Sequence, residues 1–334
     1  MSRGAEVLKI LMMSIDYVSA EKLEQILGVS RITIDKAVNE LVTKGFVIDM
    51  NSKLGYRLVD LDDLSKINKY VEYLDTEIKF SVNYIEVCDS TQDIAFKLAE
   101  EGAPEGTVVL AEELKRGRGR LGRQWVASRG GLWLSLILRP RELAYINLLS
   151  LAIAVAVIDA IKTVLGVDAK VKWPNDVILN EKKVAGILIE GSTEANTLKY
   201  AVVGIGVNVN NVLPQELISI ATTLKNSIGF EIPRIPLLLN IFKNIDDVYI
   251  LLKQNQSNEV IKRWRKHSST INRYVKIVTP NEEIKGLAED VESDGALRIR
   301  TIEDKIVKVY VGDVIHLREQ NPTSLANLNI SNIY

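Results

Sequence analysis

Residues 117–123 combine glycine and arginine in a pattern that suits the binding of a small anion. The segment reads Gly-Arg-Gly-Arg-Leu-Gly-Arg, with three glycines and three arginines, and Lys115, Arg116 and Trp125 flank it. Glycine lets the backbone approach a ligand closely because it has no Cβ. Arginine presents a rigid, always-charged fork that pairs with a carboxylate or a phosphate at two points. The segment therefore predicts a loop that folds around a small anion or an acyl phosphate.

The alternative for this loop is an arginine-rich tract that binds nucleic acid without sequence preference. The pattern is short, however, and it occurs once in the chain. It also leads into residues 130–138, whose apolar alternation is typical of a packed strand. We therefore favour a ligand-binding loop.

A second polar cluster lies further along the chain, where Lys172, Asn175 and Asp176 stand among strand residues. A turn at 180–182 returns the chain, and antiparallel pairing is expected to bring Lys183 close to the cluster. A lysine beside an aspartate is often a surface ion pair of little energetic value. Next to a loop of arginines, the group instead favours a nucleotide phosphate with its Mg²⁺, since magnesium binds one or two carboxylates together with phosphate oxygens.

Small residues stand at two other strand ends. Ser90 and Thr91 follow a predicted strand and precede a predicted helix, where capping of that helix is the ordinary role. Gly204 and Gly206 lie in a second strand, but Val209 replaces the third glycine of a dinucleotide-binding fingerprint. Glycine inside a strand indicates close approach of a ligand or of another backbone.

Composition describes an ordinary globular chain of several domains. The 334 residues are 47% hydrophobic and 25% charged, with a net charge of −1. That balance argues against a chain devoted wholly to nucleic acid. One cysteine, Cys88, and two histidines leave no disulfide framework and little for a zinc site. No signal-peptide pattern is visible, and the apolar segment 148–158 is too short to span a membrane, so we expect a soluble cytoplasmic protein with no membrane association.

The first 60 residues have the pattern of a winged helix-turn-helix. Expected helices span residues 4–14, 20–27 and 31–44, and a hairpin follows at 46–59. The side chains expected to face DNA are Arg31, Thr33, Lys36, Asn39 and, at the tip of the wing, Lys53. Residues 1–60 contain eight Lys/Arg and eight Asp/Glu, so phosphate binding would depend on the placement of charge. A domain that contacts only protein is the alternative.

The remaining chain divides by pattern into four further segments. A polar, charge-mixed linker is expected at 61–79 and a catalytic domain at 80–272. Short alternating strands at 273–319 favour a small SH3-like β-barrel, and a polar, frayed tail follows at 320–334.

Several motifs together resemble the biotin–protein ligases, and among them the bifunctional members that are also DNA-binding repressors. The matching segments are Asp89-Ser90-Thr91, 117–123 with Trp125, 172–176, Lys183-x-Ala185-Gly186-Ile187-Leu188 and Gly204-Ile205-Gly206-x-Asn208. The resemblance covers nearly the whole chain. It implies an α+β multidomain protein whose catalytic domain is similar to class II aminoacyl-tRNA synthetases, with a mixed sheet. It also implies that biotin and ATP form biotinyl-adenylate and that a lysine of a biotin carboxyl carrier protein domain then receives the biotin.

The resemblance also implies roles for residues of this chain. The catalytic set is Lys183, Arg118, Arg120 and Asp176, with Asp176 holding Mg²⁺ through phosphate. The biotin set is Ser90, Thr91, Gln92, Arg118, Gly119, Arg120, Lys183, Gly186, Gly204 and Gly206. The ATP set is Gly117, Arg120, Arg123, Trp125, Asn175, Lys183 and Asn208. Operator DNA and a homodimer that forms when the adenylate is bound are the further expected partners.

Two positions depart from the family pattern. Leu114 stands where a glutamine is usual, which removes a hydrogen bond to biotin, and Arg116 stands where a small residue is usual. Three alternatives stay open at this point: a regulator that senses biotinyl-adenylate without transferring it, a ligase whose winged helix has lost its operator, and a lipoate-type ligase.

Overall fold

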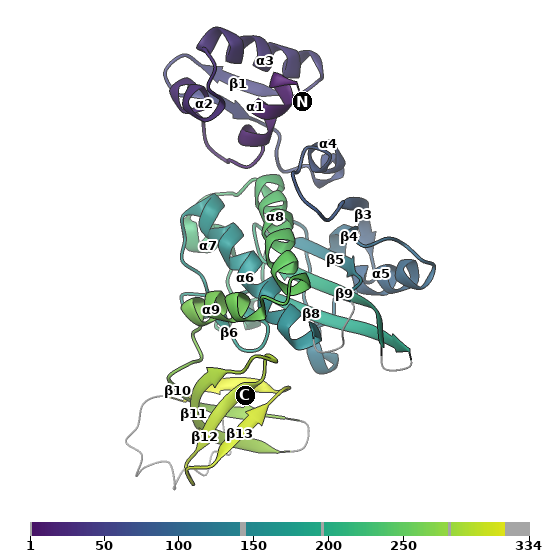
Figure 1. Cartoon of the computed structure of the whole chain (residues 1–334), viewed down its shortest axis with the longest axis vertical. Helices are drawn as coiled ribbons and strands as arrows, with labels where there is room; N and C mark the ends of the chain where they lie inside the picture. Colours follow the sequence, from purple (N-terminus) through teal and green to yellow (C-terminus); the bar gives the residue numbers. More distant parts are fainter. Residues whose placement is uncertain (1, 141–144, 195–196, 280–281, 318–334) are drawn as a thin grey trace.

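The protein has three structural parts that follow one another along its long axis (Figure 1). The computed structural model describes residues 2–140, 145–194, 197–279 and 282–317. A small helical domain with a two-stranded hairpin lies at one end, a seven-stranded sheet with its helices in the middle, and a five-stranded sheet at the other end. The expected tail at 320–334 lies outside the described residues.

The N-terminal part is a winged helix-turn-helix, as the sequence predicts. Its elements are α1 (Arg3–Leu11), α2 (Ala20–Leu27), α3 (Arg31–Thr43), β1 (Ile48–Asn51) and β2 (Gly55–Leu58). The hydroxyls of Ser2 and Ser19 accept backbone N–H bonds at the starts of α1 and α2, which is the usual N-cap arrangement. Strands β1 and β2 pair antiparallel and form the wing.

The segment predicted as a linker is packed against both of its neighbours. It contains η1 (Leu64–Lys66) and α4 (Asn68–Val71). Leu64 and Ile67 are fully buried, and Tyr70 meets Phe46 of the winged helix edge-on at 5.8 Å between ring centroids. The polar composition of this segment reflects only its exposed side, because its apolar residues at helical spacing face inward.

The central sheet has the order β3-β4-β5-β9-β8-β7-β6. Its strands are β3 (Ser81–Cys88), β4 (Thr107–Leu114), β5 (Leu132–Leu138), β6 (Lys170–Lys172), β7 (Asp176–Leu179), β8 (Lys182–Glu194) and β9 (Thr197–Val207). The pair β3–β4 is parallel and the other pairs are antiparallel. The expected mixed sheet is therefore confirmed.

Helices cover both faces of this sheet, to different extents. They are α5 (Thr91–Glu100), α6 (Tyr145–Leu165), α7 (Leu224–Ile228), α8 (Arg234–Lys253) and α9 (Ser257–His267), with short turns η2 (Arg120–Gly122) and η3 (Gln215–Leu217). Helix α6 packs on β6, β7 and β8, and α8 and α9 pack on α6. On the opposite face α5 packs mainly against β4, β5 and β9. On this face of the sheet, β7 and β8 are therefore open, and the arginine-glycine segment lies beside them.

Helix α6 is the most apolar part of the chain. Residues 146–165 are long and apolar enough to cross a membrane by length and composition, but most of them are buried inside the protein. Ile153, Val155 and Val157 have no exposed surface. An apolar helix that is covered on all sides is typical of a domain core, so the expected buried helix is confirmed.

The C-terminal part is an antiparallel sheet with the order β13-β12-β11-β10-β14. Its strands are β10 (Arg273–Val278), β11 (Glu283–Val291), β12 (Leu297–Thr301), β13 (Ile306–Val309) and β14 (Asp313–His316). Among the described residues, β13 and β14 are edge strands that do not pair with each other. The expected closed SH3-like barrel is thus not established, because alternating apolar residues predict strands but do not determine whether a sheet closes.

The end of the linker is anchored by a buried carboxylate, which gives a test of the packing. Asp246 of α8 accepts the backbone N–H groups of Glu77 at 2.9 Å and Ile78 at 2.8 Å. Asp246→Ala leaves these donors without partners and should lower the free energy of unfolding by about 1–3 kcal/mol. Chemical denaturation of the variant measures this, with the exposed neighbour Asp247→Ala as control. Equal stability of the two variants would contradict the anchoring role.

Candidate active site

A cavity of about 610 Å³ lies on the open face of the central sheet. Three regions of the chain form its walls: the sheet with the start of α5, the arginine-glycine segment, and strands β10 and β14 of the C-terminal sheet. The predicted site residues on its wall are Ser90, Thr91, Gln92, Arg118, Gly119, Arg120, Arg123, Trp125, Asn175, Asp176, Lys183, Gly186, Gly204 and Gly206. Residues that are far apart in sequence therefore meet around one space.

Two paired glycines form the floor of the cavity. Gly186 of β8 lies opposite Gly206 of β9 in the antiparallel register. A Cβ at Gly206 would lie 2.8 Å from the indole of Trp125, and one at Gly186 would lie 3.1 Å from the same ring. Trp125 therefore rests directly on the backbone, where a side chain at position 206 would displace the indole and one at position 186 would press against it. The Lys183 ammonium lies 5.2 Å from the centre of the indole, within cation–π range.

One end of the cavity is a buried cluster of neutral hydrogen-bonding groups. The Ser135 hydroxyl lies 2.9 Å from the Thr91 hydroxyl and 2.8 Å from Gln92 Oε1. Gln92 Nε2 donates to the Val202 carbonyl at 3.0 Å. Ser90 accepts the backbone N–H of Asp93, so it caps α5 as the ordinary interpretation predicts. This end of the cavity can offer both donors and acceptors to an uncharged polar group.

Ser135 was not predicted, although the sequence carried a signal for it. It is the polar residue in the otherwise apolar strand Leu132–Leu138, and its side chain is almost fully buried. A buried hydroxyl in a strand centre needs a partner, so its presence alone indicates a polar neighbour on that face.

Arg118 spans the cavity from α5 to β8. Its guanidinium donates to Asp93 and, at 3.1 Å, to Glu190. Burial by itself would lower the pKa of Arg118, but the hydrogen bonds to Glu190 and Asp93 outweigh burial and raise it. The arginine is therefore charged and held in place by acceptors of the protein itself.

Arg120 and Arg123 connect the loop to the C-terminal sheet. Arg120 Nη1 donates to Asn175 Oδ1 at 3.3 Å and to the Gly312 carbonyl at 3.4 Å, and Arg123 pairs with Asp313. Burial lowers the pKa of Arg120, which the nearby carboxylates only partly offset. The contacts to Gly312 and Asp313 were not predicted, because nearly 200 residues separate the partners and no local pattern indicates them.

Lys183 and Asp176 face each other across the β7–β8 hairpin, as the expected pairing requires. Lys183 Nζ lies 2.6 Å from Asp176 Oδ1, and about a third of each side chain is exposed. Lys172 lies on the wall beside them, and burial lowers its pKa. Lys172, Lys183, Arg120 and Arg123 outnumber Asp176 and Asp313 on this part of the wall, and the positive balance suits a phosphate.

Two predicted ATP contacts do not lie on the cavity wall. Gly117 forms the neck of the loop, where its carbonyl accepts the Trp125 backbone N–H at 2.8 Å. Asn208 is buried, and its Oδ1 accepts from Asn211 Nδ2 at 3.1 Å. The side chain of Asn208 is therefore engaged within its own loop, and its contact with the nucleotide stays a prediction.

The described residues contain no group of three or more His, Cys, Asp or Glu side chains that could hold a metal by themselves. Asp176 and Asp313 are the carboxylates on the cavity wall. One or two carboxylates suit Mg²⁺ only when phosphate oxygens complete its coordination. The donor set thus fits a magnesium ion that enters with a nucleotide.

The winged helix presents the predicted DNA-facing residues on its surface. Arg31, Lys36, Asn39 and Lys53 are exposed, while Thr33 is partly buried with its hydroxyl 3.2 Å from that of Ser30. Four other basic residues of this part pair with carboxylates: Arg3 with Glu6, Lys9 with Asp75, Lys44 with Glu40 and Arg57 with Asp49. Within the described residues, Arg31, Lys36 and Lys53 take part in no such ion pair, and neither does the exposed Lys22 of α2. Three of these four unpaired cations lie on the predicted side.

Comparison with protein families defines the class of the catalytic part. Residues 84–208 match the biotin/lipoate A/B protein ligase family. Residues 270–317 match the biotin protein ligase C-terminal domain, and residues 3–57 match a helix-turn-helix domain. The chain thus belongs to the class of biotin/lipoate ligases in which a helix-turn-helix domain precedes the ligase domain.

Individual relatives identify the family. The chain is 33% identical to the bifunctional ligase/repressor BirA of Bacillus subtilis over 90% of its length and 94% of that protein. It is 30% identical to BirA of Escherichia coli over 91% of its length and 94% of that protein. A solved biotin protein ligase from Aquifex aeolicus in complex with biotin and ATP superposes with a TM-score of 0.62, at 30% identity, over 72% of this chain and 99% of that one. The chain therefore belongs to the family of bifunctional biotin ligase/repressors, and the resemblance seen in its motifs is confirmed.

The contact between Trp125 and the glycine floor can be tested directly. Gly206→Ala places a methyl group against the indole, which should move Trp125 toward solvent at a cost of about 1–3 kcal/mol in stability. All four tryptophans lie in described residues, and Trp133, Trp173 and Trp264 are buried, so acrylamide quenching of fluorescence reports mainly on Trp125.

The expected result is stronger quenching in Gly206→Ala than in wild type. Gly119→Ala is the control, because a Cβ there lies 3.7 Å from its nearest neighbour and meets only ordinary contact. Unchanged quenching in a folded Gly206→Ala variant would show that the indole does not depend on this glycine.

Proposed function

We propose that this protein activates biotin with ATP and transfers it to a lysine of a biotin carboxyl carrier protein domain. The observation that carries the proposal is the convergence of Arg118, Arg120, Lys183 and Asp176 on one cavity that also has a buried neutral polar end. Biotin combines an uncharged ureido ring with a carboxylate. Its two ends therefore match the two ends of the cavity.

In the first step, a carboxylate oxygen of biotin bonds to the α-phosphorus of ATP while the bond to the bridging oxygen breaks and pyrophosphate leaves. Lys183 and Arg120 stabilise the negative charge on the phosphate, and Arg118 holds the carboxylate. Asp176, together with phosphate oxygens, would hold Mg²⁺, and the ion would supply further neutralisation of phosphate charge. Positioning and electrostatics suffice, since the reaction needs no side-chain nucleophile.

In the second step, the amine of the carrier lysine bonds to the acyl carbon, the bond to the phosphate oxygen breaks and AMP leaves. The amine proton passes to solvent, and Asp176 orients the incoming amine. Trp125 and the arginine-glycine segment cover the adenylate and exclude water, which would otherwise hydrolyse it.

Individual contacts follow from the lining of the cavity. Thr91, Gln92 and Ser135 bind the ureido ring, Ser90 holds the start of α5, and Gly119, Gly186, Gly204 and Gly206 leave room for the ligand. Arg123, Trp125 and Asn175 contact the nucleotide, with Gly117 shaping the loop. Leu114 lies on the wall and offers biotin only apolar contact.

We also propose that the winged helix binds operator DNA and represses transcription, and that the adenylate-bound protein is a cytoplasmic homodimer. The free cations of α3 and the wing support DNA contact. The proposed domains are 1–60, the linker 61–79, a class II synthetase-like catalytic domain at 80–272 and an SH3-like domain at 273–319.

The alternatives differ in measurable ways. A regulator that only senses biotinyl-adenylate would not need Lys183 and Asp176 to lie close together beside the arginines, as they do in this structure. A lipoate-type ligase would activate lipoate in preference to biotin, so competition between the two acids during activation separates these enzymes.

Lys183→Ala tests the enzyme directly. Removing the ammonium should lower the rate of biotin- and ATP-dependent pyrophosphate release by about 10²–10³-fold, the usual loss for one charge-stabilising group. Lys170→Ala, an exposed lysine on the neighbouring strand β6, is the control and should behave as wild type. Turnover should continue only with a carrier domain present. No pyrophosphate release from a folded wild type would rule out the ligase reaction.

Lys36→Ala tests the DNA-binding side. Loss of one phosphate-binding cation should reduce the slope of log K against log salt by about 1. Lys44→Ala, at the C-cap of the same helix, is the matched control, because Lys44 is already paired with Glu40 at 2.6 Å. Gel-shift titrations at several salt concentrations measure both, and equal slopes for the two variants would move the DNA contact away from this face.

A further inference from the structure

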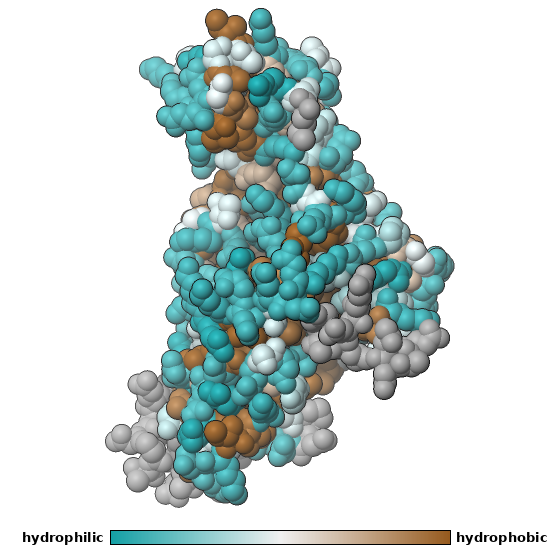
Figure 2. Space-filling view, viewed as in Figure 1, coloured by the Kyte–Doolittle hydropathy of each residue, from teal (hydrophilic) through white to brown (hydrophobic). Residues whose placement is uncertain are grey.

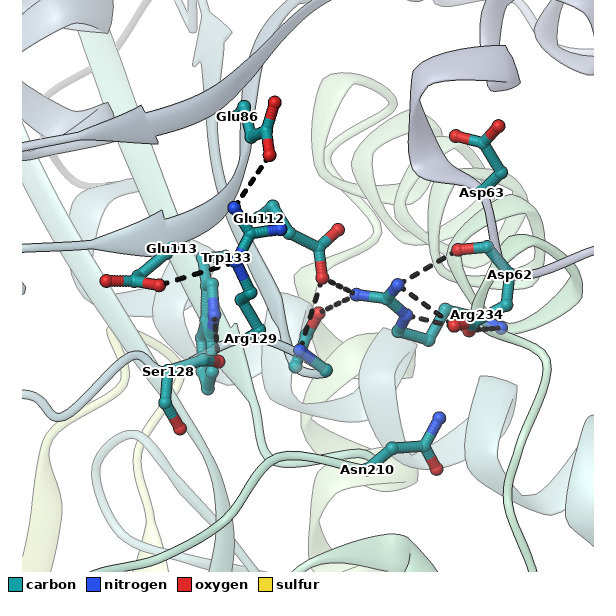
Figure 3. Close-up of polar contacts among 12 residues, drawn as sticks. Asp62, Asp63, Glu86, Glu112, Glu113, Ser128, Arg129, Trp133, Asn210 and Arg234 are labelled. Atoms are coloured by element: carbon teal, nitrogen blue, oxygen red, sulfur yellow. Dashed lines mark hydrogen bonds and ion pairs between the residues drawn. The ribbon is translucent and has the colours of Figure 1, made fainter.

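Arg234, the first residue of α8, lies outside the cavity and is almost completely buried, with 5% of its surface exposed. Its guanidinium has five N–H donors, and each has an acceptor (Figure 3). Nε and Nη2 donate to the two Asp62 carboxylate oxygens at 2.7 and 3.0 Å, and Nη2 also donates to the Asp62 carbonyl at 2.9 Å. Nη1 donates to Glu112 Oε1 at 2.7 Å and to the Gly131 carbonyl at 3.1 Å.

Two of the three acceptor residues, Glu112 and Gly131, lie on either side of the arginine-glycine segment 117–123. Glu112 lies on β4 just before this segment, and Gly131 lies just after it, directly before β5. Glu112 Oε1 also accepts the backbone N–H of Gly130 at 3.2 Å. One side chain, Arg234, therefore ties the entry of the ligand loop to its exit.

A short series of contacts leads from this junction to the cavity. Trp133, two residues after Gly131, donates from its indole to the Ser128 carbonyl at 3.0 Å and meets Trp125 edge-on at 6.2 Å between centroids. A shift of the Gly130–Gly131 turn would therefore move the side chains on which Trp125 packs.

The third partner, Asp62, belongs to the linker that follows the wing. Two backbone N–H groups of the first turn of α8 donate to the linker, Arg234 N to the Asp62 side-chain Oδ1 at 3.1 Å and Ile235 N to the Leu61 carbonyl at 2.9 Å. Burial alone would lower the pKa of Arg234, but Asp62 and Glu112 raise it, so the group stays charged. Removing either carboxylate leaves this buried charge with only one counter-ion.

We propose that Arg234 is a positioning residue for the ligand loop, and that Asp62 makes the winged-helix linker part of the same unit. The proposal rests on the function given above. The linker then influences how firmly the loop closes on biotin and its adenylate, and by reciprocity ligand binding influences how firmly the linker is held.

Arg234→Lys and Asp62→Ala test the proposal. Lysine keeps the charge but lacks the planar fork that reaches Asp62 and Glu112 together. Asp62 is about half exposed, at 54% of its side chain, so its replacement is compatible with folding. Both variants should raise KM for biotin in pyrophosphate release by about tenfold, within the usual range of coupling between sites, while kcat changes little.

Two further variants separate positioning from general loss of stability. Glu112→Gln keeps an oxygen that can accept both bonds made to Oε1 but removes one counter-ion, so it should lower the unfolding midpoint while KM for biotin stays close to wild type. Glu112→Ala should resemble Asp62→Ala. Lys66→Ala is the matched linker control, because Lys66 pairs with Asp60 at 2.5 Å and Asp63 at 3.2 Å but does not contact Arg234. It should leave KM for biotin unchanged.

A readout that is independent of activity completes the test. Acrylamide should quench Trp125 more strongly in Asp62→Ala than in wild type or Lys66→Ala, without any ligand. A folded Asp62→Ala with wild-type quenching and wild-type KM would overturn the proposal, as would a lower unfolding midpoint with no change in either quantity. A wild type that forms no adenylate would contradict the proposed function instead, and the quenching comparison would still decide the role of Arg234.

Discussion

The contact between the Trp125 indole and the backbone of β8 and β9 is the constraint on which the site depends. Two glycines, one on each strand, must lie opposite each other for the ring to reach the sheet. Once the ring is placed there, the preceding arginines have to lie over the open half of the sheet face, beside the β7–β8 hairpin. Helix α5 covers only the other half, so the cavity is what remains between α5, the loop and the C-terminal sheet.

The charges around this cavity are paired within the protein. Arg118, Arg120 and Arg123 each bond to a carboxylate, amide or carbonyl oxygen, and Lys183 bonds to Asp176. Cations that the protein already holds in fixed positions can stabilise new negative charge with little reorganisation. The face of the molecule seen in Figure 2 is mostly hydrophilic, with hydrophobic areas over the winged helix and over the C-terminal sheet.

The sequence predicted those features that local patterns determine. Helical spacing and caps gave the winged helix, and strand alternation with a turn at 180–182 placed Lys183 beside Asp176. Features that depend on distant partners were missed. Ser135 needed Thr91 and Gln92 as partners, the Gly312 and Asp313 contacts cross from another domain, and Arg234 is an ordinary helix-start residue until Asp62 and Glu112 are beside it. The bond between Asn208 and Asn211 was also missed, because a motif shows which residues are present but not which way a side chain turns. Closure of the C-terminal sheet was undetermined because apolar alternation predicts strands but not how a sheet closes.

The most direct test of the central claim is a crystal structure of the protein grown with biotin and ATP. The account predicts density for biotinyl-adenylate inside the cavity, with the ring system against Thr91, Gln92 and Ser135 and the phosphate within hydrogen-bonding distance of Lys183. Density for the ligand at another surface, or a cavity that stays empty at saturating biotin and ATP, would contradict it.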